Sequence, residues 1–147
     1  MAGRFEGTTV IDRPIEEVFA YLADGTNDLK FSPRVQEMAK GTDGPTGVGT
    51  VYKSTVKDAG MTTKREFKIT EFEQPTKIRW AEVSTNQVTA PEGGYDLAPE
   101  GNGTRVTVYN VLEGHGIGKL FAPLALRSAR KGADQFAQSI KTAVEAS

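Results

Sequence analysis

The chain has 147 residues, with 18 basic and 19 acidic side chains that give a formal net charge of −1. These charges are interspersed rather than gathered in blocks, which argues against nucleic-acid binding and against recruitment to an anionic membrane by a long-range field. The sequence contains no cysteine, which excludes disulfides, thiolate metal sites and thiol catalysis.

The first predicted elements are a strand and two short helices. Alternation and β-branched residues predict a strand over residues 4–12, and its last residue, Asp12, can cap the helix that follows. That helix ends at residues 24–25, and residues 27–31 form a second short helical turn. The apolar stripe of the first helix, at helical spacing, consists of Ile15, Val18, Phe19 and Leu22.

From residue 34 onward the apolar pattern has period two, and glycine and proline punctuate it, which predicts strands joined by turns. One turn falls at residues 58–60, and Gly93-Gly94 predicts a bulge or bend. The six predicted strands cover residues 35–40, 50–57, 61–72, 77–84, 88–98 and 104–113.

The turn at residues 73–76 fixes a register between its two flanking strands. In that register Ile69 lies opposite Trp80 and Phe67 lies opposite Glu82. Arg65, on the apolar side of its strand, then has Glu82 as its diagonal neighbour. Because an unpaired buried guanidinium is costly, Arg65 is either half of a structural ion pair or a polar anchor for a ligand.

The last predicted element is a long amphipathic helix over residues 122–144, roughly 33 Å in length at 1.5 Å per residue. Pro123 suits its first turn. Its alanines either allow close packing on a sheet or leave a space beneath the helix. The apolar stripe consists of Leu126, Ala129, Ala133, Phe136, Ala137, Ile140, Ala143 and Val144.

The segment before this helix carries a second set of apolar residues. At 100° per residue these residues point to a different face from the main stripe. We therefore expect a bend at Pro123 and a separate flap over residues 117–124. The four apolar residues of the flap are Ile117, Leu120, Phe121 and Leu124.

Four motifs and the terminal helix resemble, in order and approximate spacing, the polyketide cyclase/dehydrase-like branch of the START-like (SRPBCC) superfamily. The motifs are TTVIDRPIEEVFAYLAD, GPTGVGTVY, ITEFEQPTKIRWAE and YDLAPEGNGTRVTV. The resemblance covers nearly the whole chain. It departs at Phe31, where relatives often have tryptophan.

The resemblance implies an α+β helix-grip fold. In this fold a seven-stranded curved antiparallel sheet wraps around a long C-terminal helix, and two short helices follow the first strand. We expect residues 1–147 to form a single domain of this kind. In many members of the superfamily a cavity between sheet and helix takes a hydrophobic ligand.

Candidate residues for such a cavity are the aromatic, polar and small side chains expected on the inner faces. Each also has a purely structural interpretation, as a core residue, a strand-end residue or an ion pair. The candidates are Arg65, Phe67, Trp80, Glu82, Tyr95, Asn110, Ala129, Ala133, Phe136 and Ala137.

Other chemistry finds little support. His115, the one histidine, is either a general base or an exposed loop residue. The glycines around it lack the GK[ST] signature of a phosphate loop. No ligand cluster has the spacing of a metal site, and no cofactor is indicated.

Two functions remain open. The first is a carrier or sensor that binds a hydrophobic small molecule, such as a lipid or an aromatic polyketide metabolite. The second is a polyketide cyclase or aromatase-dehydratase acting in the same cavity, where Arg65, Tyr95 or Asn110 would polarise a carbonyl group. We expect a cytoplasmic monomer or weak homodimer with no integral membrane association, because no segment approaches 18 consecutive apolar residues.

Overall fold

The structure is a computed structural model that describes residues 2–58 and 60–147. The predicted element order is confirmed. The turn predicted at residues 58–60 includes Ala59, which lies outside the described residues. The elements are β1 (Ala2–Ile11), α1 (Ile15–Ala23), the 3-10 helix η1 (Gly25–Lys30), β2 (Val35–Lys40), β3 (Val51–Asp58), β4 (Met61–Glu73), β5 (Lys77–Glu82), β6 (Val88–Glu100), β7 (Gly103–Gly114) and α2 (Gly118–Glu145).

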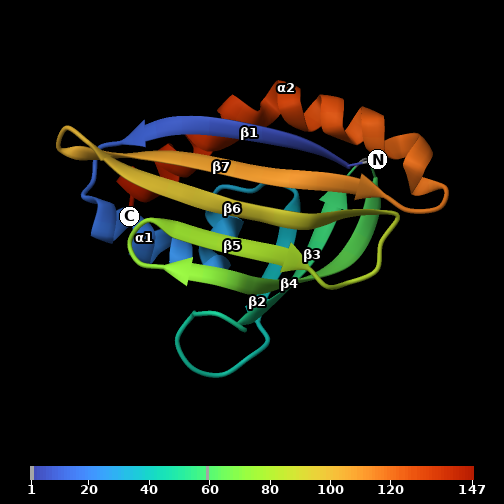
Figure 1. Cartoon of the computed structure of the whole chain (residues 1–147), viewed down its shortest axis with the longest axis horizontal. Helices are drawn as coiled ribbons and strands as arrows, with labels where there is room; N and C mark the ends of the chain where they lie inside the picture. The colour runs from blue at the N-terminus through green and yellow to red at the C-terminus, as the bar shows by residue number, and fades with distance from the viewer. Residues whose placement is uncertain (1, 59) are drawn as a thin grey trace.

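The seven strands form one antiparallel sheet in the order β1-β7-β6-β5-β4-β3-β2. The predicted pairs of β4 and β5 are confirmed, since Ile69 pairs with Trp80 and Phe67 pairs with Glu82. Next to the turn, however, Glu73 pairs with Lys77 rather than Thr76, and a β-bulge between Ile69 and Glu71 restores the predicted register. Figure 1 shows the curved sheet with α2 along its β1–β7 side and α1 behind it. This is the predicted α+β helix-grip architecture.

The core lies between one face of the sheet and the helices. Val18 and Phe19 of α1 meet Ile140 and Val144 of α2 in one hydrophobic cluster with residues from the central strands. The strand residues of this cluster alternate along their strands, so the residues between them lie on the opposite face of the sheet. Those strand residues are Ile11, Ile69, Ile78, Tyr95, Leu97, Val106 and Val108.

Small residues bring α2 close to β1. A side chain at Gly7 would collide with the backbone carbonyl of Ala133 and meet the Cβ of Ala137. The alanine stripe therefore packs closely on β1 at this point, which matches the first of the two interpretations of the alanines.

The expected flap is wrong, because α2 already begins at Gly118 and Pro123 lies inside it. Gly118 and Ala122 are both buried and continue the core-facing stripe towards the N-terminus. A side chain at Gly118 would collide with the carbonyl of Gln87, so this turn is anchored on the body of the protein. The apolar pattern of the sequence did not indicate this contact, because glycine contributes no apolar side chain.

Two smaller predictions are also wrong. The bulge in β6 falls between Thr89 and Glu92, where Pro91 cannot donate to the ladder. Pro14, rather than Asp12, occupies the N-cap of α1. The Asp12 amide instead donates to the carboxylate of Glu145 at 2.9 Å.

In the described ranges no helix combines the length and the apolar character needed to cross a membrane.

Candidate ligand-binding site

Three of the predicted cavity residues meet on the core-facing side of the sheet. The indole N–H of Trp80 donates to Asn110 Oδ1 at 2.9 Å, although the two residues belong to β5 and β7. Gly93 of β6 lies between the two residues, and a side chain at this position would collide with Trp80 Nε1 and Asn110 Oδ1. The Trp80 ring also meets the Tyr95 ring edge-on at a centroid distance of 5.1 Å. Trp80, Tyr95 and Asn110 therefore form one contiguous cluster.

Asp28 and Tyr21 form a second set of polar residues, next to Tyr95. Burial, together with the nearby Asp28 and Tyr21, raises the pKa of Tyr95 well above its ordinary value. Burial, with repulsion from Asp24, also raises the pKa of Asp28 to about 7. Asp28, which is half-buried, can therefore hold or release a proton near neutral pH.

The hydroxyl of Tyr21 is the unsatisfied member of this group. Its oxygen is buried, and it has no hydrogen-bond partner among the residues that the structure describes. Buried hydroxyls nearly always have a partner, so a buried one without a partner is informative. The sequence analysis missed Tyr21 and Asp28, because neither stands out in a short helix and the turn that follows it.

Tyr21 also borders an open groove of about 700 Å³. The groove runs between η1, with the residues that follow it, and the C-terminal half of α2. Phe31 lies in its lining, and the Phe31 ring meets the Phe136 ring at a centroid distance of 5.8 Å. The lining residues are Tyr21, Leu29, Lys30, Phe31, Ser32, Pro33, Gln135, Gln138, Ser139, Thr142, Ala143, Ala146 and Ser147.

Arg65 and Glu82 form the predicted pair. One guanidinium nitrogen of Arg65 lies 3.2 Å from both oxygens of Glu82 and also donates to the Val88 carbonyl at 2.9 Å. The Glu82 side chain is fully buried, whereas the Arg65 side chain is 21% exposed. The pair therefore joins β4, β5 and the start of β6.

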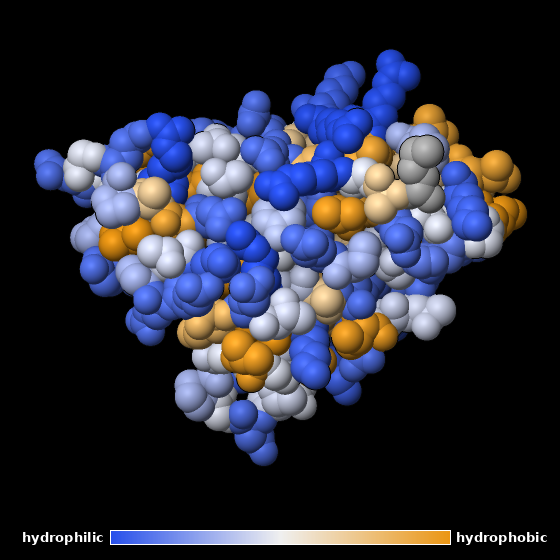
Figure 2. Space-filling view, in the orientation of Figure 1, coloured by the Kyte–Doolittle hydropathy of each residue, from blue (hydrophilic) through white to orange (hydrophobic). Residues whose placement is uncertain are grey.

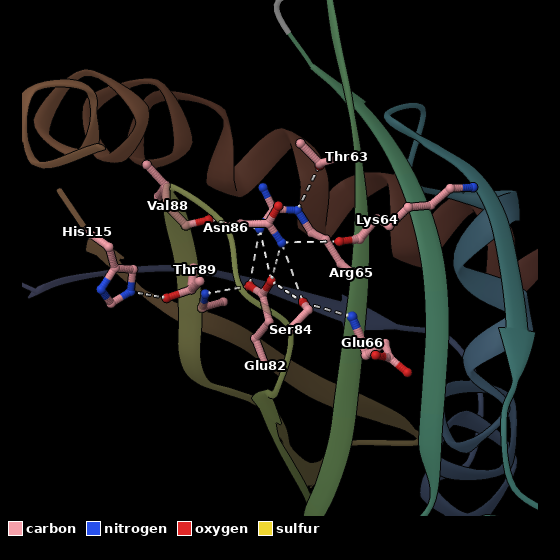
Figure 3. Close-up of polar contacts among 11 residues, drawn as sticks. Thr63, Lys64, Arg65, Glu66, Glu82, Ser84, Asn86, Val88, Thr89 and His115 are labelled. Atoms are coloured by element: carbon pink, nitrogen blue, oxygen red, sulfur yellow. Dashed lines mark hydrogen bonds and ion pairs between the residues drawn. The ribbon is translucent and has the colours of Figure 1, made fainter. Parts of the chain in front are cut away.

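The carboxylate of Glu82 has three further donors, drawn in Figure 3. Ser84 Oγ donates at 2.7 Å, Asn86 Nδ2 at 3.0 Å and the Ala90 amide at 2.8 Å. Such complete satisfaction is what allows a carboxylate to be buried. These contacts match the structural ion-pair interpretation of Arg65.

Beside this pair lies a smaller open hollow of about 370 Å³, with His115 in its lining. His115 Nε2 and Thr89 Oγ1 are hydrogen-bonded at 2.7 Å, and the histidine side chain is 49% exposed. It lies in the connection between β7 and α2, as the exposed-loop interpretation requires. The lining consists of Glu82, Ser84, Thr85, Asn86, Thr89, Pro91 and His115.

The remaining predicted residues are distributed over β4 and α2. Phe67 is half-buried, and it pairs with Tyr52 on one side and Glu82 on the other. Ala133 and Ala137 are buried, and Ala129 is partly exposed. Of the ten predicted residues, Glu82 borders one of the two hollows described above, and Phe136 contacts the lining of the other through Phe31.

Among residues 2–58 and 60–147, no group of three histidine, aspartate or glutamate side chains is placed to hold a metal ion.

Comparisons with known proteins place this geometry in context. A family model described as "Polyketide cyclase / dehydrase and lipid transport" matches residues 2–145. A sequence comparison with curated proteins found no significant match.

Several solved structures share the fold. TTHA0849 from Thermus thermophilus has a TM-score of 0.81 at 18% identity, over 98% of each chain. The Zhui aromatase/cyclase from Streptomyces sp. R1128 has a TM-score of 0.79 at 15% identity, over 99% of this chain and 94% of that one. Ara h 8.0201 has a TM-score of 0.68 at 20% identity, over the full length of both chains. At these identities the similarity establishes the fold alone.

Proposed function

The chain belongs to the polyketide cyclase/dehydrase and lipid transport family, and from that membership we propose that it is a carrier or sensor of a hydrophobic small molecule. We place the ligand at the Tyr21 groove, with its far end directed towards the Trp80–Tyr95–Asn110 cluster. The ligand class is a lipid or an aromatic, polyketide-like metabolite.

The observation that carries this proposal is the buried hydroxyl of Tyr21. Tyr21 lines a groove that also contains Phe31, and no described residue forms a hydrogen bond with its hydroxyl. A ligand with an apolar body and one hydroxyl or carbonyl group would cover the aromatic surface and complete this hydrogen bond. The rings of Phe31 and Phe136 supply flat apolar contact for such a body.

The proposal is tested with two matched probes, naphthalene and 2-naphthol, which differ by one hydroxyl group. We expect Tyr21→Phe to weaken 2-naphthol binding about fivefold, the value of one net hydrogen bond, and to leave naphthalene binding unchanged. The fluorescence of Trp80, the one tryptophan, reports both titrations. Equal effects on the two probes would show that Tyr21 makes no polar contact with the ligand.

A second pair of variants tests the inner cluster. Trp80→Ala should weaken binding of an apolar fluorescent probe more than Arg65→Gln, because apolar area dominates the affinity for such a probe. If Trp80→Ala has no effect, the ligand does not reach the sheet.

The second candidate function is the cyclase or aromatase-dehydratase reaction, and Asp28 favours it. A carboxyl group with a pKa of about 7 beside Tyr95 can transfer a proton at neutral pH. Incubation with a linear poly-β-ketone would then give a cyclised product that has lost water, detected by mass spectrometry. Asp28→Asn should abolish that product and preserve binding of the poly-β-ketone. Binding without any product supports the carrier function.

A further inference from the structure

The start of α2 carries apolar side chains on its solvent side. Opposite them on the same turns lie the buried residues Gly118 and Ala122. Figure 2 shows apolar side chains gathered at the right-hand end of the molecule, where α2 begins in Figure 1. We call this set the outer apolar patch, and its members with their exposed fractions are Ile117 (58%), Leu120 (73%), Phe121 (50%) and Leu124 (65%).

The geometry of the helix makes this patch continuous. At 100° per residue, positions 117, 120, 121 and 124 lie within one sector of the helix surface, about 180° from the core-facing stripe. The first turns of α2 are therefore apolar on both sides. One side packs on the protein, and the other side is unpartnered among the residues that the structure describes.

Positive charge is concentrated in the same part of the chain as the outer apolar patch. Residues 114–133 contain four basic side chains and no acidic one, although the whole chain has a net charge of −1. The charges that are interspersed overall are therefore locally sorted at this end of the molecule. The four basic residues are Lys119, Arg127, Arg130 and Lys131.

Two of these cations, Arg127 and Lys131, are available for a partner that binds the patch. Arg127 and Lys131 are exposed and continue the outward sector of the helix by one more turn. Arg130 Nε donates to the backbone carbonyl of Arg4, which leaves its charge without a carboxylate partner in the described chain. The acidic residues next along the chain are Glu113 and Asp134, at the two limits of the segment.

The positive charge near the outer apolar patch indicates which partner can bind there. A two-fold contact with a second copy through this patch would bring Arg127 and Lys131 of both copies together, and like charges oppose such a contact. A bilayer that contains anionic lipids offers apolar chains to the patch and negative headgroups to the cations.

We propose that the first half of α2 docks on the surface of membranes that contain anionic lipids. The outer apolar patch enters the boundary between headgroups and acyl chains, and Arg127 and Lys131 contact the headgroups. This peripheral contact goes beyond the proposed ligand binding, because the patch lies at the start of α2 and the groove borders its C-terminal half.

The test is co-sedimentation of the full chain with vesicles of phosphatidylcholine alone or in equal parts with phosphatidylglycerol. We expect binding to the mixed vesicles, weakened by salt, and little binding to phosphatidylcholine alone. Leu120→Ser/Leu124→Ser should abolish binding. Arg127→Gln/Lys131→Gln should weaken it about 25-fold, since each basic residue contributes about a factor of five.

Lys40→Gln/Lys68→Gln is the charge-matched control and should bind as the wild type does, because both lysines lie outside α2, on β2 and β4. Far-ultraviolet circular dichroism confirms that each variant is folded. Absence of vesicle binding by the wild type would overturn the proposal. So would equal losses in the control and the α2 variants, or a wild-type dimer that Leu120→Ser/Leu124→Ser converts to monomer. Probe binding in the groove is measured separately, so failure of one proposal does not affect the other.

Discussion

At the scale of single residues, the buried carboxylate of Glu82 is the most demanding group in the molecule. Taking a charge out of water is costly unless it is paired and hydrogen-bonded. Here Arg65 compensates the charge, and Ser84, Asn86 and the Ala90 amide supply the remaining donors. The Glu82 side chain thereby connects β4 and β5 to the beginning of β6.

We therefore expect Arg65→Met to destabilise the protein by about 3–5 kcal/mol, because it leaves Glu82 buried without a counter-charge. The double variant Arg65→Met/Glu82→Leu should recover about half of that loss, since it removes the uncompensated charge as well. Urea unfolding of the wild type and both variants measures the difference. A single variant as stable as the wild type would mean that Glu82 remains hydrated.

The raised pKa of Asp28 predicts that folding stability changes with pH in the direction opposite to that expected from an ordinary carboxylate. Its pKa rises from 3.8 in the unfolded chain to about 7 in the folded protein, so folding takes up a proton between these values. Its contribution to stability is therefore greatest at low pH and is lost as the pH rises towards 7.

The expected slope from Asp28 is at most about 1.4 kcal/mol per pH unit, the limit for one proton. Asp28→Asn should remove this slope and should be the more stable protein at pH 8. Subtracting the unfolding free energies of the two proteins at each pH isolates the contribution from those of other carboxylates. Parallel curves would place the Asp28 carboxyl in water.

Sequence reasoning identified some site residues and missed others for a physical reason. Arg65 and Glu82 were predicted as a pair from the turn at residues 73–76, although the structure reaches that register through a β-bulge between Ile69 and Glu71. Tyr21 and Asp28 were missed because their burial depends on how a helical segment packs against a distant strand. No periodicity within the segment itself encodes that contact.

At the scale of elements, the contact between α2 and β1 depends on residues without side chains. Gly7 leaves room for the backbone of α2, whereas Gly132 lies on the opposite side of the helix, where an added Cβ would have nothing within 4 Å. The same substitution at the two positions should therefore have opposite effects.

We expect Gly7→Ala to destabilise the protein by about 1–3 kcal/mol, through overpacking against Ala133 and Ala137. Gly132→Ala should stabilise it by about 0.5–1 kcal/mol, because alanine is the better helix former. Thermal and urea unfolding of the two variants provide the comparison. A harmless Gly7→Ala would mean that α2 can move away from β1 at little cost.

The elements themselves were largely predictable. Each strand and helix was found within a few residues of its bounds, since alternation and helical spacing are properties of the local sequence. Two of the three errors share a cause. At Gly118 and at Gly93, glycine serves close approach to another element rather than flexibility. A sequence shows that a glycine is present, but it does not show which element packs against it.

At the scale of the whole molecule, the sheet order joins distant parts of the chain. β1 pairs with β7 along its whole length, and α2 covers both. At the other end of β1, Glu145 of α2 accepts from the Asp12 amide. The beginning and the end of the sequence therefore depend on each other.

We accordingly expect the chain to unfold in one cooperative transition. Fluorescence of Trp80, which reports on the sheet, and far-ultraviolet circular dichroism at the helical minimum should give the same urea midpoint. If the helical signal is lost at lower urea than the fluorescence, α2 detaches before the sheet unfolds.

The pairing of β1 with β7 also bears on how the protein is made. A ribosome must add the residues between Ile11 and Gly103 before the first strand can find its neighbour, which takes roughly 5–20 s at typical rates of translation. During that interval the nascent chain exposes an unpaired, alternating strand to its surroundings. Until β7 has been made, the amino-terminal strand would remain available for binding by holding chaperones.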